Sequence, residues 1–209
     1  MTGAAPFERC IRRGGVAVFP ADTVYGLACA PDDRAAVERL YALKGRASHK
    51  PAAVMFFSLE AALAELGELG PRTHAALERL LPGGVTLLLA NPARRYPLAC
   101  GEDPATLGLR VPALPALRAV RVPVLQSSAN AAGARDARRL ADVPEAIRAG
   151  ADLVLDGGEL PGTPSTVLDL RSYEAAGAWT VLRAGAVPAE AVGTVLGPPP
   201  APPSGEPPP

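Results

Sequence analysis

Three cationic side chains lie within seven residues of one another, at a spacing that could bind a multiply charged anion. They are Lys44, Arg46 and Lys50, and these two lysines are the only ones in a chain that has 19 arginines. Cations this close repel one another unless an anion brings them together, and a polyphosphate would do so. The alternative is a helix C-terminus, where cations favour the helix dipole and need no ligand.

Hydroxyl and amide side chains cluster at three further places, each next to a predicted strand. Asp22 and Thr23 follow the first strand, and residues 127–130 (Ser-Ser-Ala-Asn) follow a later one. The third cluster begins at Ser165. Such groups can orient a ligand at strand ends, where binding sites are often assembled. The alternatives are a simple turn at Asp22, a helix N-cap or Asx-turn at Asn130, and an ordinary strand after Ser165.

Two arginines stand at the ends of predicted strands. Arg110 lies in the sequence Gly-Leu-Arg-Val-Pro, and Arg183 lies in Leu-Arg-Ala-Gly. A guanidinium at such a position can bind a carboxylate through two parallel hydrogen bonds. We therefore add Arg110 to the candidate anion-binding residues, with Arg183 as a second cation at a strand end.

Several common catalytic patterns are absent from the sequence. There is no Gly-x-x-x-x-Gly-Lys-Ser/Thr loop, no Gly-x-Gly-x-x-Gly turn and no Gly-x-Ser-x-Gly motif. Two histidines in unpromising contexts disfavour a Ser-His-Asp triad, and three cysteines without a Cys-x-x-Cys pair disfavour zinc and a disulfide scaffold. We expect catalysis to rest on cations, hydroxyls and amides, with no metal-ligating residues.

Composition and charge limit the class of protein. The 209 residues are 48% hydrophobic and 20% charged, which is typical of a globular protein. With 21 basic and 21 acidic residues, a strong non-specific grip on nucleic acid or anionic membrane is disfavoured as the main activity. The N-terminus lacks a signal-peptide pattern, and no apolar run approaches the roughly 18 residues of a membrane span. We expect a soluble cytoplasmic protein with no membrane partner.

Short apolar runs alternate with helical patterns along the chain. Asp32 or Asp33 is expected to cap a helix that carries an i, i+3, i+4 apolar stripe from Val37 and ends at Gly45. The remaining predicted elements are strands over 16–19, 53–57, 85–89, 107–111, 122–125, 153–155, 166–170 and 179–182, and helices over 71–81, 112–120, 143–149 and 188–196. This alternation predicts an α/β or α+β domain around a mixed sheet over residues 7–197. Residues 198–209 hold eight prolines, and we expect them to form a disordered tail.

Taken together and in their order, the motifs resemble the YrdC/TsaC family of threonylcarbamoyl-adenylate synthases. The resemblance covers nearly all of the predicted domain. Its motifs are PADTVYGL (20–27), LKGR followed by KP (43–46 and 50–51), GLRVP (108–112), SSAN (127–130), STVLDL (165–170) and LRAG (182–185). The family commonly has Thr at Ala21, Pro at Ala47 and Leu at Ala52, so the loop contacts around the ligand differ while every cation and hydroxyl is kept. Since only the proline-rich tail follows the predicted domain, we expect the additional C-terminal domain of longer relatives to be missing.

The resemblance implies a single YrdC-like domain, with a twisted mixed sheet flanked by helices and a concave basic cavity. It implies the reaction of L-threonine, bicarbonate and ATP to threonylcarbamoyl-adenylate and pyrophosphate, with Mg²⁺ accompanying ATP. The adenylate would then supply threonylcarbamoylation of the tRNA adenosine next to the anticodon, through a separate tRNA-threonylcarbamoyl transferase machinery. Weak RNA binding by the domain itself is also expected.

The resemblance also assigns roles to individual residues. The catalytic group is Lys44, Arg46, Ser128 and Asn130, with the two cations neutralising phosphates and Ser128 and Asn130 orienting the nucleotide. The ATP-binding residues are Arg46, Lys50, Thr106, Ser128, Asn130, Asp136 and Arg183. The threonine-binding residues are Thr23, Met55, Arg110, Gln126 (through its backbone) and Ser165.

Two other functions remain open on sequence alone. One is an RNA-binding module that uses the basic cleft without chemistry, with Arg135, Arg138 and Arg139 as candidate phosphate contacts; a solvated helix face is the alternative for these three. The other is a paralogue that handles a different carbamoyl-adenylate, as in carbamoyltransferase maturation proteins, which generally carry additional domains.

Overall fold

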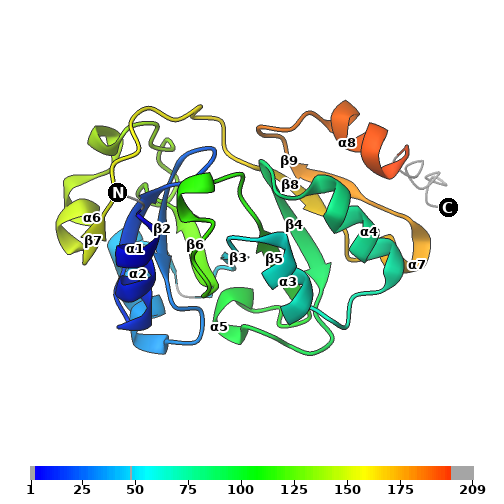
Figure 1. The fold of residues 1–209 in the computed structure, drawn as a ribbon, viewed down its shortest axis with the longest axis horizontal. Helices are drawn as coiled ribbons and strands as arrows, with labels where there is room; N and C mark the ends of the chain where they lie inside the picture. The colour runs from blue at the N-terminus through cyan, green and yellow to red at the C-terminus, as the bar shows by residue number, and fades with distance from the viewer. Residues whose placement is uncertain (1–2, 48, 199–209) are drawn as a thin grey trace, which may run out of the picture.

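The computed structural model describes residues 3–47 and 49–198, and in these ranges the backbone forms a nine-stranded mixed sheet with helices packed on it (Figure 1). The strands are β1 (Ala17–Pro20), β2 (Tyr25–Cys29), β3 (Ala53–Met55), β4 (Val85–Ala90), β5 (Thr106–Arg110), β6 (Val124–Ser128), β7 (Leu153–Val154), β8 (Thr166–Asp169) and β9 (Thr180–Arg183). The helices are α1 (Ala4–Arg12), α2 (Arg34–Lys44), α3 (Leu59–Glu65), α4 (Pro71–Leu80), α5 (Pro97–Cys100), α6 (Glu145–Gly150), α7 (Tyr173–Ala176) and α8 (Ala189–Leu196), with 3₁₀ turns η1 (Pro115–Leu117) and η2 (Leu140–Asp142). The predicted α/β class is confirmed.

The strand order is β7-β1-β2-β6-β3-β5-β4-β8-β9, so strands distant in sequence become neighbours. Parallel pairs (β1 with β7, β3 with β5, β4 with β8) are mixed with antiparallel pairs. β7 and β8 follow each other in sequence but lie near opposite ends of the sheet. The yellow connection along the top of Figure 1 joins them. There the amide of Gly162 donates to the Thr23 carbonyl at 2.9 Å, which ties this connection to the β1–β2 turn.

Alternate side chains of the central strands enter two apolar clusters, one on each face of the sheet. In β3, for example, Val54 belongs to the larger cluster and Met55 to the smaller one, which α1 covers. Phe7 of α1 meets Phe19 and Phe57 edge-on, with ring centroids 5.2 and 5.4 Å apart. Beyond the part covered by α1, the same face carries polar side chains, and these form the candidate site.

Helix α2 follows the local signals in its sequence. The carboxylate of Asp33 accepts from the Ala36 amide at 3.1 Å as an N-cap, and Gly45 ends the helix at φ 60°, in the left-handed region that favours glycine. Leu40 and Tyr41 are fully buried, as the predicted apolar stripe requires. The helix end therefore places Lys44 and Arg46 at a defined position beside the sheet.

Other elements differ from expectation. A helix over 112–120 is wrong: only η1 forms there, because Pro112 and Pro115 restrict the backbone and remove amide donors. Residues 25–29 form β2, a fully buried strand that includes a glycine and shows no polar alternation, so its pattern gave no strand signal. Helices α1, α3, α5 and α7 were also unpredicted. Residues 199–209, nearly all of the predicted tail, lie outside the described residues.

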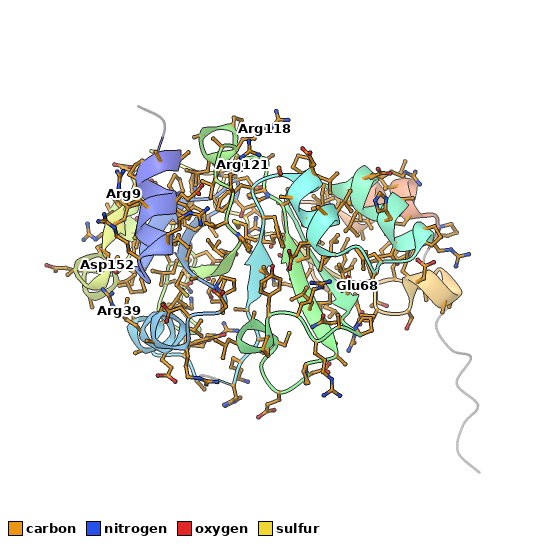
Figure 2. All side chains as sticks on the ribbon, turned by 60° about the horizontal axis from the view of Figure 1, so that its bottom comes forward. Arg9, Arg39, Glu68, Arg118, Arg121 and Asp152 are labelled. Atoms are coloured by element: carbon orange, nitrogen blue, oxygen red, sulfur yellow. The ribbon has the colours of Figure 1, made fainter. Side chains whose placement is uncertain are left out.

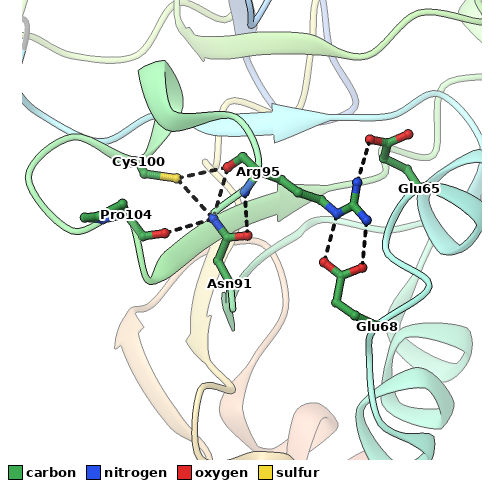
Figure 3. A network of polar contacts seen from close by, with 6 residues as sticks. All are labelled: Glu65, Glu68, Asn91, Arg95, Cys100 and Pro104. Carbon is green, nitrogen blue, oxygen red and sulfur yellow. Dashed lines mark hydrogen bonds and ion pairs between the residues drawn. The ribbon is translucent and has the colours of Figure 1, made fainter. Parts of the chain in front are cut away.

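A polar network outside the site fixes the loop between β4 and β5 (Figure 3). Asn91, 2% exposed, donates to the carbonyls of Arg95 and Pro104 at 3.0 Å and accepts from the Arg95 amide at 3.0 Å. The Arg95 guanidinium bonds Glu68 through two nitrogens, at 2.8 and 3.1 Å. This loop contains α5, whose Ala99 carbonyl accepts from the Ala52 amide at 2.9 Å. The network therefore helps to hold one wall of the site.

The longest described helix, α2, has 11 residues, and no helix in the described ranges is long and apolar enough to cross a membrane.

Candidate functional site

A cavity of about 170 Å³ lies on the part of the sheet face that α1 leaves open. On β4 and β5, the neighbours of the lining residues, such as Leu87 and Leu109, enter the larger apolar cluster, so strand alternation directs Thr86 and Arg110 to the cavity. The lining residues are Thr23, Val24, Arg46, Pro51, Ala52, Ala53, Thr86, Arg110, Gln126, Ser127, Ser128, Asp136, Pro164, Ser165, Val167 and Arg183. All six sequence motifs contribute to this one cavity.

Larger hollows lie around α1. One of about 470 Å³ is lined by Arg9, Arg13, Arg39 and Asp152 among others, and Figure 2 shows Arg9, Arg39 and Asp152 on that side of the molecule. Arg39 is already paired with Asp152 at 2.6 Å, with both side chains 43% exposed. Since no residue of the six motifs lines this hollow, the smaller polar cavity is the candidate site.

Arg110 is a buried cation in the floor of the cavity. Its Nη2 donates to Asp22 Oδ1 at 2.6 Å and to Thr23 Oγ1 at 3.3 Å, and the residue is 3% exposed. Burial lowers the pKa of Arg110, the Asp22 carboxylate opposes this, and the cation of Arg183 lowers the pKa further. The buried Nε of Arg110 has no hydrogen-bond partner among the described residues.

Ser165, Thr86 and Arg183 form a hydrogen-bonded wall of the cavity, contributed by β4, β9 and the residue before β8. The hydroxyls of Ser165 and Thr86 are 2.7 Å apart, and Arg183 Nη2 donates to the Ser165 carbonyl at 2.7 Å and to its Oγ at 3.3 Å. A β-bulge directs Arg183 to this wall: Val181 pairs with Leu168 and Arg183 with Val167, so Leu182 between them is unpaired and 54% exposed.

Arg46 reaches the cavity from the turn after α2. Its amide donates to the Tyr41 carbonyl at 3.0 Å, which closes the helix end, and its Nη2 donates to the Pro51 carbonyl at 2.7 Å. Its Nε is buried without a partner in the described structure. Arg46 thus brings a third guanidinium to the lining.

Lys44 lies behind the lining and is 3% exposed. Its ammonium donates to the carbonyls of Ser128 and Asn130 at 2.5 and 2.9 Å and to Asn130 Oδ1 at 3.2 Å. Ser128 Oγ in turn donates to Asn130 Oδ1 at 2.5 Å. Burial lowers the pKa of Lys44 to about 8, with the cation of Arg46 acting in the same direction and Asp136 opposing it. The structure brings three residues of the predicted catalytic group into mutual contact.

Gln126 presents its side chain to the cavity. Its backbone pairs with Ala28 on β2 and Ala53 on β3 in the middle of the sheet, so its peptide groups belong to the ladder. A Cβ at Gly26 would lie 3.1 Å from Gln126 Nε2 and 2.9 Å from Phe19, so the glycine leaves room for this side chain. The expected contact through the backbone of Gln126 is therefore less accessible than one through its amide.

Besides Lys44 and Asn130, which contact Ser128 without lining the cavity, the structure places three further predicted residues outside the lining. Met55 is fully buried in the smaller apolar cluster, and Lys50 is exposed beside Pro51. Thr106 lies at the other end of β5 from Arg110, where its hydroxyl donates to Asp103 Oδ2 at 2.6 Å. Their ligand roles stay predictions.

Thr86 lines the cavity but was missed from the sequence. The available signal was a single hydroxyl within the apolar run 85–89, which also suits an ordinary strand. Only the pairing of β4 with β8 shows that this hydroxyl faces Ser165.

Two of the three arginines considered for RNA binding share one carboxylate. Arg138 and Arg139 both pair with Glu159, at 2.9 and 2.7 Å. These contacts instead join the loop before α6 to the connection between β7 and β8.

Neither a thiolate nor a protein metal cage is available at the site. Burial raises the pKa of Cys29 to about 12, and desolvation also raises the pKa of Cys10 and Cys100. Within residues 3–47 and 49–198, no group of three or more His, Cys, Asp or Glu side chains could hold a metal ion. The described lining therefore offers cations, hydroxyls, an amide and the carboxylate of Asp136.

The fold is that of an α/β protein, and its cavity gathers guanidinium and hydroxyl groups that suit an anionic ligand. The sequence model of the Sua5/YciO/YrdC family, described as "Telomere recombination", matches residues 9–185. The chain belongs to this family.

Individual relatives agree with this assignment. A threonylcarbamoyl-AMP synthase of Chromohalobacter salexigens is 37% identical over 170 residues, which are 78% of this chain and 90% of the relative. The crystal structure of Pyrococcus abyssi Sua5 complexed with L-threonine is 30% identical with a TM-score of 0.80, covering 92% of this chain and 56% of Sua5. Escherichia coli YciO is 25% identical with a TM-score of 0.75, covering 90% and 91% of the two chains.

Proposed function

We propose that this protein is an L-threonylcarbamoyl-adenylate synthase: it converts L-threonine, bicarbonate and ATP to threonylcarbamoyl-adenylate and pyrophosphate. The observation that carries the proposal is the convergence of Arg46, Arg110 and Arg183 on one cavity, against two carboxylates that the described residues place there: Asp136 in the lining and Asp22 bound to Arg110. In a chain of zero net charge, such a concentration of cations favours an anionic ligand. The relatives' names and the threonine complex of P. abyssi Sua5 support threonine and an adenylate as the chemistry.

Two groups of lining residues suit the two substrates. Arg110, Thr23 and Ser165 would bind threonine, with the Arg110 guanidinium on its carboxylate. Arg46, Ser128, Asp136 and Arg183 would bind ATP, with Arg183 next to the threonine residues because it donates to Ser165. The partnerless Nε atoms of Arg46 and Arg110 support this assignment, because a buried donor without an acceptor is unfavourable and a bound anion would supply acceptors after a small side-chain shift.

The chemistry needs little from the protein beyond position and charge. The amine of threonine and bicarbonate combine to a carbamate with loss of water. A carbamate oxygen then attacks the α-phosphorus of ATP, and the bond to the β-phosphate oxygen breaks to release pyrophosphate. Guanidiniums held beside a triphosphate neutralise the charge that develops in such a step. Holding the carboxylate at Arg110 leaves the amine end of threonine free to reach the nucleotide.

Magnesium and the downstream steps belong to the same proposal. Mg²⁺ commonly arrives bound to the phosphates with few protein ligands, and Asp136 is the carboxylate of the lining that could assist it. The adenylate would pass to a tRNA-threonylcarbamoyl transferase machinery in the cytoplasm, for modification of the adenosine beside the anticodon. Weak RNA binding and a boundary of the domain at 7–197 remain part of the proposal.

Pyrophosphate release from ATP tests the proposed function. We expect release to require both L-threonine and bicarbonate, and to fall strongly in Arg110→Gln. Arg39→Gln, an exposed arginine outside the cavity that pairs with Asp152, is the control for loss of an arginine–aspartate pair and should retain activity; circular dichroism checks that Arg110→Gln is folded in the assay. Release that is independent of threonine in the unmodified protein would refute the proposal.

A further inference from the structure

Lys44 was expected to neutralise phosphates, but its surroundings leave its ammonium no free donor. An ammonium has three N–H groups and no acceptor. The Ser128 carbonyl, the Asn130 carbonyl and Asn130 Oδ1 are three acceptors at hydrogen-bond distance, and Ser128 Oγ lies further off at 3.5 Å. Each N–H therefore has a protein partner before any ligand is bound.

The burial of Lys44 leads to the same conclusion. The residue is 3% exposed and is not part of the cavity lining, whereas Arg46 and Ser128 are. A phosphate could reach the Lys44 ammonium only by displacing one of its three acceptors, two of which are carbonyls of the main chain. Leaving those carbonyls unpaired in a buried place would itself be unfavourable.

What Lys44 touches is the end of β6 and the loop after it. The amide of Ala132 donates to the Lys44 carbonyl at 2.9 Å, so both the main chain and the side chain of this residue bind the 128–132 segment. The Asn130 amide then donates to the carbonyls of Ala131 and Ala134, at 3.0 and 2.6 Å. Lys44 thus connects the C-terminus of α2 to the turn that sets the direction of Ser128 Oγ.

We propose that Lys44 is a positioning residue: its ammonium ties α2 to the Ser128–Asn130 turn and so orients Ser128 in the cavity, without contacting the substrates. The lowered pKa of Lys44 agrees with an enclosed ammonium. The inference rests on the proposed function only for the identity of the nucleotide.

The salt dependence of ATP binding separates positioning from direct contact. A cation that contacts phosphate contributes to the decrease of affinity with salt, because its attraction is screened. The probe is a non-hydrolysable ATP analogue, with its affinity measured over a range of NaCl concentrations for the unmodified protein, Lys44→Met and Arg46→Met. We expect Lys44→Met to weaken binding with an unchanged salt slope, and Arg46→Met to make the slope shallower. A slope in Lys44→Met as shallow as that in Arg46→Met would overturn the proposal.

A double-mutant cycle and hydrogen exchange test the tie itself. If Lys44 acts through Asn130, the double variant Lys44→Met/Asn130→Ala loses no more kcat/KM than the worse single variant, and each single loss is about 10²-fold. Amides of residues 129–134 should exchange faster in Lys44→Met. Additive losses with unchanged exchange would contradict the proposal.

These experiments can be interpreted even if Lys44→Met does not fold or the proposed reaction is wrong. Lys44→Gln, whose amide can donate to two of the three acceptors, is the milder variant if Lys44→Met does not fold. Since binding and exchange need no threonine, the tie can be confirmed even if the proposed reaction fails, and the reaction can be confirmed if the tie fails.

Discussion

Replacing Asp22 by Asn should destabilise this protein far more than the same change at Asp152. Both carboxylates bind an arginine at 2.6 Å, Arg110 for Asp22 and Arg39 for Asp152, and both accept from a backbone amide. The difference is burial: the first pair is 4% and 8% exposed, the second 43% and 43%. The two variants are therefore matched in chemistry and differ in environment.

The expected magnitudes follow from that burial. Removing the charge of Asp22 leaves the Arg110 cation buried without a counterion, which costs about 3 kcal/mol, the lower end of the range because Asn keeps an acceptor oxygen. For a domain of this size the loss corresponds to a Tm lower by about 6–12 °C. The exposed Arg39 pair should contribute less than about 1 kcal/mol.

Urea unfolding followed by circular dichroism measures both variants. L-threonine should then stabilise Asp22→Asn more than Asp152→Asn, because its carboxylate supplies Arg110 with the counterion that the variant lacks. Equal losses in the two variants would refute the argument from burial. An equal response to threonine would refute the placement of its carboxylate at Arg110.

Further predictions concern three other residues. Thr86→Val removes the hydroxyl that lies 2.7 Å from the Ser165 hydroxyl and keeps the side-chain shape, so KM for threonine should rise. Thr86→Ser keeps a hydroxyl and should have the KM of the unmodified protein. An unchanged KM in Thr86→Val, measured by steady-state kinetics, would show that the hydroxyl does not matter. Burial lowers the pKa of Lys44 from 10.5 to about 8. Between pH 8 and pH 10.5, Lys44 therefore holds its proton in the unfolded chain and loses it in the folded one. The free energy of unfolding, relative to that of Lys44→Met, should rise as the pH increases through this range. Urea titrations at several pH values check this, and a constant difference between the two proteins would contradict the lowered pKa. Met55→Leu should change KM for threonine little, because Met55 is fully buried among apolar side chains; a large rise in KM would return Met55 to the threonine site.

The parts of the fold that sequence predicted best depend on local interactions. The cap at Asp33, the apolar stripe from Val37 and the left-handed Gly45 all act within α2, so their consequences can be read from a short segment. The strand β2 could not be predicted in this way, because it is stabilised by pairing with β1 and β6 on both sides. The wrong helix over 112–120 had the right apolar spacing, but two prolines limit it to the single turn η1.

The site depends on non-local pairing to a greater degree. Sequence could identify Arg110 and Arg183 as cations at strand ends, but not that β5, β4, β8 and β9 lie in that order and bring them to one cavity. The bulge at Leu182, which sets the direction of Arg183, has no signal in the sequence. Conversely, Lys44, Arg46 and Lys50 lie close together in sequence but have different places in the structure. Lys44 is enclosed, Arg46 lines the cavity and Lys50 is exposed.

Mass spectrometry of the product formed from ¹³C-bicarbonate tests most directly how the cavity orients threonine. With the carboxylate held by Arg110, the amine end must carry the new carbon to the α-phosphorus, so the product should contain threonine, one ¹³C atom and AMP. An adenylate of threonine without the label would mean that the carboxylate itself attacks ATP, and would contradict the account.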